Sequence, residues 1–395
     1  MTADHSTHPF DARTRLFLDR PQSRKWSLHP GRIGAWVAEM DFGVAPEIAG
    51  ALHRAIDDEN LGYLSPPQAA DLSVATADWM RDEYGWAVDP ERVHPVSDVM
   101  AALGVAVQEY APAGSPVIVP TPAYMPFLTY LPAVGHPVIE APGVVVDGRW
   151  QHDLQRIDEA FAAGARTLVL CNPHNPTGTI AGRAELEAIA EVVQRHGGRV
   201  FADEIHSPLR YEGAPFVPYA SVSEATAAHT VTGTSASKAW NIPGLKTAQL
   251  ITSNDVDQEL YKRFGFAVQH GAATLGVVAS TAAYRHGRPW LADVIGYLDG
   301  SRRELAALVD EHLPGAVYRA PEATYIGWID TAALGIPGPP AEFFRDRAGV
   351  VLTEGRLLGR GAEQFVRVVF ATPRPILEEA FAAMGAAVRE HARRR

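Results

Sequence analysis

Short apolar runs alternate with amphipathic stretches along most of the chain. Runs rich in β-branched and other apolar residues predict four buried strands, at 117–119, 167–170, 199–202 and 248–251. Helical spacing of apolar positions predicts helices between these strands, at 98–110, 153–162 and 183–196. Strands that alternate with helices are typical of an α/β domain whose sheet is largely parallel.

The last third of the chain has a different pattern. Helical spacing dominates through 261–287 and 288–312. Strands at 323–330 and 365–370 then precede a closing helix at 376–393, which indicates a second, α+β unit. Because 395 residues exceed the size at which one core keeps growing, we expect two domains. The predicted units are an N-terminal segment that packs with the small domain, a large domain and a small C-terminal domain, at 1–44, 45–287 and 288–395.

Composition narrows the class of protein. Apolar residues make up 47% and charged residues 21%, the balance of an ordinary soluble globular protein. The net charge of −11 and the scattered basic residues argue against nucleic acid as a partner. The single cysteine, Cys171, allows no intrachain disulfide and indicates a cytoplasmic protein. We expect no membrane helix, because no long uncharged apolar run occurs, and no metal, because the histidines lack ligand spacing.

Three chemically rich segments each follow a predicted strand. They are CNPHNPTG at 171–178, ADEIH at 202–206 and TSASKAWN at 234–241. Taken singly, they have plain structural explanations: a bent loop, a helix cap and a surface lysine. Together, at the strand ends where open α/β sheets bind ligands, they offer an amine at Lys238, a carboxylate at Asp203, an amide at Asn175 and several hydroxyls. These groups are what pyridoxal 5′-phosphate needs for its imine, pyridinium, phenolate oxygen and phosphate.

These motifs together resemble fold-type I pyridoxal-phosphate enzymes of the class I/II aminotransferase superfamily, over nearly the whole chain. The string DEIH at 203–206, where many aminotransferases have DEIY or DEVY, is similar to the MalY/PatB group of cystathionine β-lyase-like carbon–sulfur lyases. WVAEMDF at 36–42, NPHNPTG at 172–178 and NIPGL at 241–245 also resemble that group. The implied α/β fold is the PLP-dependent transferase fold type I. It has a large domain with a mostly parallel, seven-stranded type of sheet between helices, and a smaller α+β domain.

The resemblance implies roles for residues around the cofactor ring. Lys238 would hold the cofactor as a Schiff base and then remove the substrate α-proton, once burial and positive charge lower its pKa. Asp203 would keep the pyridine nitrogen protonated. Asn175 would donate to the phenolate oxygen with His206 on the same side, and Tyr124 would stack on the ring. Lys238 and Tyr124 are the predicted catalytic residues, and simple packing is the alternative for His206 and Tyr124.

The start of the predicted helix at 98–110 is the predicted phosphate site, because free N–H groups and the helix dipole favour an anion there. We expect the amides of Val99 and Met100 to bind the phosphate. Asp98 departs from the family pattern, since it brings a carboxylate nearby unless it caps the helix and points away. The resemblance adds three phosphate-binding side chains: Ser235, Ser237 and Lys246. A lysine at 246 supplies charge but not the bidentate fork of an arginine.

Other residues concern the substrate and a second subunit. Arg367 alternates with apolar neighbours, so it projects from one face of a strand, and the resemblance implies that it binds the substrate α-carboxylate through two hydrogen bonds. We expect Trp36 to line the substrate entrance and Arg374 to have a structural role. Tyr63 matches a residue that reaches the phosphate of a neighbouring subunit, which implies a homodimer with shared active sites. A tyrosine in a local turn is the alternative.

The reaction implied by the resemblance is an α,β-elimination on L-cystathionine or another cysteine S-conjugate, which yields a thiol, pyruvate and ammonia. The same cofactor, lysine and carboxylate clamp are compatible with transamination, so a class I/II aminotransferase is the first alternative. A PLP-binding regulatory protein is the second alternative, although Lys238, Asp203 and Arg367 together favour an enzyme.

Overall fold

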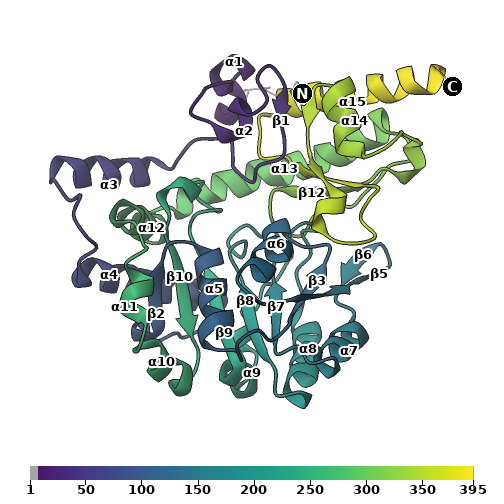
Figure 1. Ribbon diagram of the computed structural model, residues 1–395. Coiled ribbons are helices and arrows are strands. Elements are labelled where there is room, and N and C mark those ends of the chain that lie inside the picture. The colour runs from purple at the N-terminus through teal and green to yellow at the C-terminus, as the bar shows by residue number, and fades with distance from the viewer. Residues whose placement is uncertain (1–7, 395) are drawn as a thin grey trace.

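The computed structural model describes residues 8–394, and its largest sheet has seven strands (Figure 1). Their order is β2 (Val93–Val96), β10 (Ala248–Thr252), β9 (Thr230–Thr234), β8 (Arg199–Asp203), β7 (Thr167–Cys171), β3 (Val117–Thr121) and β4 (Val138–Pro142). Strands β9, β8, β7, β3 and β4 run parallel, while β10 is antiparallel to both of its neighbours. The predicted α/β fold with a mostly parallel, seven-stranded sheet is confirmed.

The central strands of this sheet are covered on both faces. Every residue of β3, β7, β9 and β10 is buried. Burial on both faces explains why the apolar residues of β3 and β7 form runs rather than alternating with polar residues. The helices that connect and cover the strands are α5 (Val99–Glu109), α6 (Met125–Ala133), α7 (Leu154–Ala162), α8 (Arg183–Arg195), α9 (Glu224–His229), α10 (Asp255–Tyr261), α11 (Gly265–Gln269) and α12 (Thr274–His286). A hairpin of β5 (Val144–Val146) and β6 (Arg149–Gln151) follows β4.

A second sheet belongs to the C-terminal part of the chain. Its strands, in order, are β11 (Val317–Tyr318), β12 (Ile326–Asp330), β15 (Phe365–Val369) and β14 (Thr353–Glu354). They accompany the helices α13 (Arg288–His312), α14 (Pro340–Arg347) and α15 (Arg374–Arg393). In Figure 1 the long α13 runs from beside α12 to the part of the molecule that holds the second sheet.

The N-terminal segment returns to this C-terminal part. Strand β1 (Ile33–Gly34) pairs in parallel with β13 (Val350–Val351), so the purple and yellow ends of the chain lie side by side in Figure 1. The remaining helices of the first quarter of the chain are α1 (Arg15–Leu18), α2 (Arg24–Ser27), α3 (Pro46–Asp57) and α4 (Pro66–Tyr84). The division at 1–44, 45–287 and 288–395 stays a prediction.

Two predicted elements differ from the structure. The helical pattern at 261–287 is broken between α11 and α12, where the amide of Ala273 donates to the carbonyl of Lys246 instead of continuing a helix. The strand predicted at 323–330 begins only at Ile326, because Thr324 has a left-handed backbone with φ of 72°. Both departures come from contacts with distant parts of the chain, which local periodicity does not reveal.

Residues 8–394 were also searched for membrane and metal sites. Within this range no helix is long and apolar enough to cross a membrane. The same residues contain no group of three or more His, Cys, Asp or Glu side chains that could hold a metal ion.

Candidate active site

The predicted cofactor segments meet at one edge of the large sheet. Strands β7, β8 and β9 are parallel neighbours, and their register pairs Cys171 with Asp203 and Asp203 with Gly233. Asn175 and Lys238 follow shortly after the ends of β7 and β9. The carboxyl edge of a parallel sheet is where open α/β folds bind ligands. The topology therefore brings the amine, the carboxylate and the amide of these segments to the same edge.

The chain has four lysines, and Lys238 differs from the other three. The other three form ion pairs, Lys25 with Asp41, Lys246 with Asp98 and Lys262 with Glu259. Within the described residues, Lys238 has no carboxylate at ion-pair distance, and its Nζ donates to the backbone oxygen of Ala38 at 3.0 Å. Lys238 is partly buried, and a lysine withdrawn from water without a counter-ion is costly in stability, so its presence here points to chemistry rather than to folding.

The surroundings of Lys238 favour its neutral amine. Burial lowers the pKa of Lys238 to about 8, and the Arg367 guanidinium lowers it further, while Glu39 and Asp203 oppose these effects. At pH 7 about one amine in ten is then neutral, compared with roughly one in three thousand for an ordinary lysine. Lys238 is therefore prepared to act as a nucleophile and as a base near neutral pH.

Asp203 and His206 are also buried, and each could accept or donate more hydrogen bonds than it forms here. Burial raises the pKa of Asp203 to about 6, although the amide of Ile205 donates to its carboxylate at 3.2 Å. Burial, with Lys238 and Arg367, lowers the pKa of His206 to about 3, so its imidazole is neutral. The His206 Nδ1 is buried and has no hydrogen-bond partner within residues 8–394. A cationic ring nitrogen fits Asp203, because it would supply the positive charge that this carboxylate lacks.

Arg367 is a buried guanidinium surrounded by neutral acceptors. Its Nη1 donates to Asn175 Oδ1 at 3.1 Å, and its Nη2 donates to the carbonyl of Trp36 at 2.9 Å and to Thr353 Oγ1 at 3.2 Å. Its Nε is buried and has no partner in the described part of the chain, and burial lowers the pKa of the guanidinium to about 10. None of the carboxylates described in residues 8–394 forms an ion pair with it. An amino-acid carboxylate fits this group as the missing counter-ion.

Tyr124 lies beside these groups. It precedes α6 directly, is partly buried and packs edge-to-face on Phe127, with ring centroids 5.4 Å apart. Burial raises its pKa, and the charges that act on it include Arg367 and Asp203. Its predicted place in the site agrees with these neighbours, whereas its stacking on a cofactor ring stays a prediction.

The predicted phosphate site opens at the start of α5. Asp98 caps this helix, because its Oδ1 accepts the amide of Ala101 at 2.8 Å, and its Oδ2 pairs with Lys246 at 2.7 Å. The amides of Val99 and Met100, in the first turn, remain the predicted phosphate donors. Lys246, in contrast, already has a partner for its charge.

The two serines near Lys238 have different surroundings. The hydroxyl of Ser235 donates to the carbonyl of Thr247 at 2.8 Å and accepts the amide of Ser237 at 3.0 Å. Ser235 therefore holds the turn that carries Lys238, and its only hydroxyl proton is already used. The predicted phosphate-binding roles of Ser235 and Ser237 stay predictions, and Ser237 is the better placed donor of the two.

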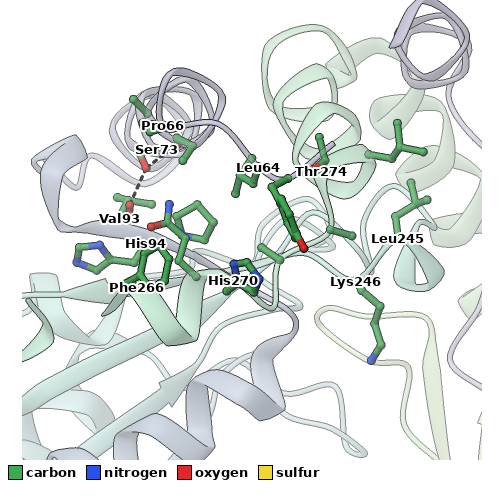
Figure 2. A pocket seen from close by; sticks show the side chains of 18 of the residues that line it. Leu64, Pro66, Ser73, Val93, His94, Leu245, Lys246, Phe266, His270 and Thr274 are labelled. Atoms are coloured by element: carbon green, nitrogen blue, oxygen red, sulfur yellow. Dashed lines mark hydrogen bonds between the residues drawn. The ribbon is translucent and has the colours of Figure 1, made fainter. Parts of the chain in front are cut away.

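Tyr63 borders a groove of about 940 Å³ that is separate from Lys238 (Figure 2). The lining includes apolar side chains of α4, α11 and α12, and Thr274 Oγ1 donates to the carbonyl of Gly62 at 2.8 Å. Tyr63 is 87% exposed and Phe266 is 85% exposed. In Figure 2 the Lys246 side chain leaves the groove, with its amine pointing away from the other labelled residues. Because Lys246 pairs with Asp98, the groove ends beside the predicted phosphate site.

Sequence reasoning missed three residues of the site: Ala38, Tyr325 and Thr353. The Tyr325 hydroxyl donates to the carbonyl of Ala38 at 3.0 Å, the same oxygen that accepts from Lys238. Trp36 was identified from the sequence, but its backbone carbonyl is the group that contacts Arg367. Its indole Nε1 donates to the carbonyl of Lys25 at 3.1 Å, so its predicted role at the substrate entrance stays a prediction.

Relatives of known description share this architecture over almost their entire length. A cystathionine beta-lyase from Corynebacterium glutamicum is 36% identical, over 92% of this chain and 95% of the relative. The cystathionine beta-lyase PatB of Bacillus subtilis is 32% identical, over 88% of this chain and 92% of the relative. The crystal structure of cystalysin from Treponema denticola, which contains a pyridoxal 5′-phosphate cofactor, has a TM-score of 0.88 at 27% identity, and the alignment covers 99% of this chain and 100% of that chain.

The family comparison agrees with these individual relatives. The family described as aminotransferase class I and II matches residues 37–384, which include every predicted site residue except Trp36. The match spans far more than half of the chain, and the shared fold is the one that positions Lys238, Asp203 and Arg367. The chain belongs to the class I and II aminotransferase family.

Proposed function

We propose that this protein is a pyridoxal 5′-phosphate-dependent carbon–sulfur β-lyase that acts on L-cystathionine or a related cysteine S-conjugate. The substrate loses its α-proton and its β-thiolate, and hydrolysis of the released aminoacrylate gives pyruvate and ammonia. One observation carries the proposal: a lysine with a pKa of about 8 shares a site with a buried arginine, and neither forms an ion pair with a carboxylate of residues 8–394. Cystathionine β-lyases among the relatives support the choice of reaction.

Lys238 has two tasks in this mechanism. The chemistry that pyridoxal 5′-phosphate supplies when bound is an electron sink for the charge left on the substrate α-carbon. Lys238 would hold the cofactor through its amine, and the same amine, when free and neutral, would take the substrate α-proton. Its low pKa serves both tasks, because only the neutral amine is a nucleophile or a base.

Arg367 and Asp203 orient and balance charge around Lys238. Arg367 binds the substrate α-carboxylate, and its contacts to Asn175 and the Trp36 carbonyl fix the plane of the guanidinium. Asp203 lies at the end of β8, where its carboxylate can pair with a protonated ring nitrogen. The burial of these groups excludes water, which strengthens every charge interaction within the site.

An aminotransferase is the second candidate, because the family includes that activity. The test is to incubate the purified, cofactor-loaded protein with L-cystathionine and to assay pyruvate and free thiol together, with the Lys238→Ala variant as control. Pyruvate and thiol in equal amounts, both absent from the variant, are the expected result. Amino-group transfer to a keto acid without release of thiol would contradict the lyase proposal and favour the aminotransferase.

We also propose a homodimer with shared active sites. The exposed apolar side chains of the groove favour a protein surface as its partner. The groove ends beside the Asp98–Lys246 pair, so a subunit seated there would bring the partner's Tyr63 close to the predicted phosphate site. This placement supports the role for Tyr63 that the sequence predicts.

Two further proposals concern the domain division and the cellular location of the protein. A division at 45–287 and 288–395, with 1–44 joined to the small domain, is supported by the two separate sheets and by the pairing of β1 with β13. A cytoplasmic location is supported by the single, buried Cys171, which leaves the chain without a possible intrachain disulfide.

A further inference from the structure

Thr324 has a strained backbone that the surrounding structure holds on every side. Its φ of 72° is rare for any residue with a Cβ and rarer for a β-branched one. Its amide donates to the carbonyl of Leu209 at 2.7 Å, its carbonyl accepts the Tyr211 hydroxyl at 2.5 Å, and its Oγ1 accepts the amide of Ile326 at 3.1 Å. Strain of this kind persists only where the surrounding structure holds it, and it is concentrated at functional sites.

The group that follows this strained residue is Tyr325. Its side chain is buried, and its carbonyl accepts the amide of Phe370 at 3.0 Å, which fixes the ring from the second sheet. Burial raises the pKa of its hydroxyl far above the working range, so the hydroxyl remains a donor at every pH of interest. The acceptor is the carbonyl of Ala38, at 3.0 Å.

The Ala38 carbonyl therefore has two donors, Tyr325 and Lys238, each at 3.0 Å. We infer that Tyr325 is a positioning residue, which fixes the Ala38 carbonyl as the place where the free amine of Lys238 is held. This inference rests on the proposed role of Lys238 as the cofactor-binding amine. The hydrogen bond to Ala38 keeps the free Lys238 amine inside the site, close to where it must take up the substrate α-proton. Without this bond the flexible lysine side chain would have no fixed position.

The shared acceptor also influences the charge of the amine. The hydroxyl proton of Tyr325 is directed at the same oxygen as the N–H of Lys238, and two positive hydrogens that meet at one oxygen repel each other. Tyr325 therefore disfavours the ammonium form, and its loss is expected to raise the pKa of Lys238. Other charged or titratable groups also face this amine, on the N-terminal segment, β8 and its following turn, and β15: Glu39, Asp203, His206 and Arg367.

The test is the rate at which cofactor-free protein takes up pyridoxal 5′-phosphate, followed by absorbance as a function of pH. Only the neutral amine reacts, so the midpoint of the rate profile reports the pKa of Lys238. In Tyr325→Phe we expect the midpoint to move up by about 0.5 to 1 pH unit, less than the one to three units that a full charge produces. The rate constant at pH 7 then falls about three- to tenfold, and kcat falls with little change in KM.

The matched control is Tyr110→Phe, which also removes a buried hydroxyl bonded to a backbone carbonyl, that of Asp257 at 3.2 Å, far along the chain from Lys238. A Tyr325→Phe midpoint equal to that of the control would overturn the inference while leaving the proposed function intact. Wild-type protein that takes up no cofactor would overturn the proposed function and, with it, this inference. If Tyr325→Phe does not fold, 3-fluorotyrosine at position 325, a stronger donor of similar shape, must move the midpoint down, and no movement would contradict the inference.

Discussion

The buried site around Lys238 and the exposed groove beside Tyr63 are incomplete in opposite ways. In the site, charged groups are buried without counter-ions: Lys238 and Arg367 form no ion pair among the described residues, and the Arg367 Nε has no partner at all. In the groove, apolar side chains such as Phe266 lie open to solvent. Each region lowers the stability of a single, unliganded chain. The site does so through buried charge, and the groove through exposed apolar surface.

The difference indicates what each region binds. Buried charges without counter-ions are stabilised by a small charged molecule that enters the site, such as an amino acid and an anionic cofactor. For the apolar groove of about 940 Å³, we propose that a protein surface, that of a second subunit, covers the exposed side chains. Functional residues often reduce the stability of the free chain in this way, and substitutions that lose function can therefore preserve or raise stability.

The largest effect is expected for Arg367→Met, which removes the predicted carboxylate clamp. A buried, charge-assisted pair is worth about 2 to 5 kcal/mol, so we expect KM for the amino-acid substrate to rise about 30- to 4,000-fold. The unfolding temperature of the cofactor-free protein should not fall, because an unpaired buried charge is removed. Steady-state kinetics and thermal unfolding measure both, with the exposed Arg303→Met as control. A KM within threefold of the wild-type value would contradict the role of Arg367.

The next effect concerns Asp203, whose pKa of about 6 in the folded chain exceeds the ordinary 3.8. A raised carboxyl pKa contributes stability that is present below about pH 4 and is lost as the pH rises through about 6. The full difference corresponds to about 3 kcal/mol, most of which develops between pH 7.5 and pH 4. Chemical unfolding of cofactor-free protein should show this pH dependence in the wild type relative to Asp203→Asn.

A cationic partner for Asp203 should remove that effect. In cofactor-loaded protein the carboxylate is expected to stay ionised, so the difference between wild type and Asp203→Asn should lose its dependence on pH in this window. If the free energy of unfolding of cofactor-free wild type and of cofactor-free Asp203→Asn changed with pH in the same way, Asp203 would not be the titrating group.

A smaller effect is expected for the groove. Phe266→Asp places a charge on an apolar surface that we propose to be buried between subunits. We expect the dimer dissociation constant to rise about thirtyfold, which corresponds to about 2 kcal/mol. Val256→Asp is the matched control, because Val256 is also exposed but does not line the groove. Sedimentation analysis that finds equal dissociation constants for the two variants would contradict the proposed interface.

The smallest effect is expected for Lys246→Met. The ion pair of Lys246 with Asp98 is exposed, and exposed pairs contribute about 0 to 1 kcal/mol to stability. Because the Lys246 ammonium is already paired with Asp98, we expect the cofactor dissociation constant to rise no more than about threefold when Lys246 is removed. An increase of more than about thirtyfold in the cofactor dissociation constant, measured by equilibrium titration, would instead make Lys246 a principal phosphate ligand, as the resemblance to the family implies.

Much of the site was predictable because it lies at strand ends. Apolar runs locate β7 and β8, and the polar residues just after neighbouring parallel strands must meet at one edge of the sheet. Strand β9, whose sequence is TVTGT, has no such run, and the sequence pattern gives it no bounds. Asn175, Asp203 and Lys238 could therefore be named from the sequence. The fold class followed from the same alternation of strands and helices.

The rest depends on contacts that no local pattern contains. The bonds of the Ala38 carbonyl join residues that are 200 and 287 positions apart, to Lys238 and to Tyr325. Similarly, the pairing of Lys246 with Asp98 spans 148 positions, so the sequence could not show that this charge is already met. The φ of Thr324 also has no local signature, because it is imposed by Leu209 and Tyr211.

The most direct test of the account is to identify the lysine that carries the cofactor. The protein is loaded with pyridoxal 5′-phosphate and reduced with borohydride, and its peptides are mapped by mass spectrometry. Because the chain has four lysines, and three of them form ion pairs, the account predicts one pyridoxyl group per chain, on Lys238 alone. A stable adduct on Lys25, Lys246 or Lys262, or no adduct at all, would contradict it.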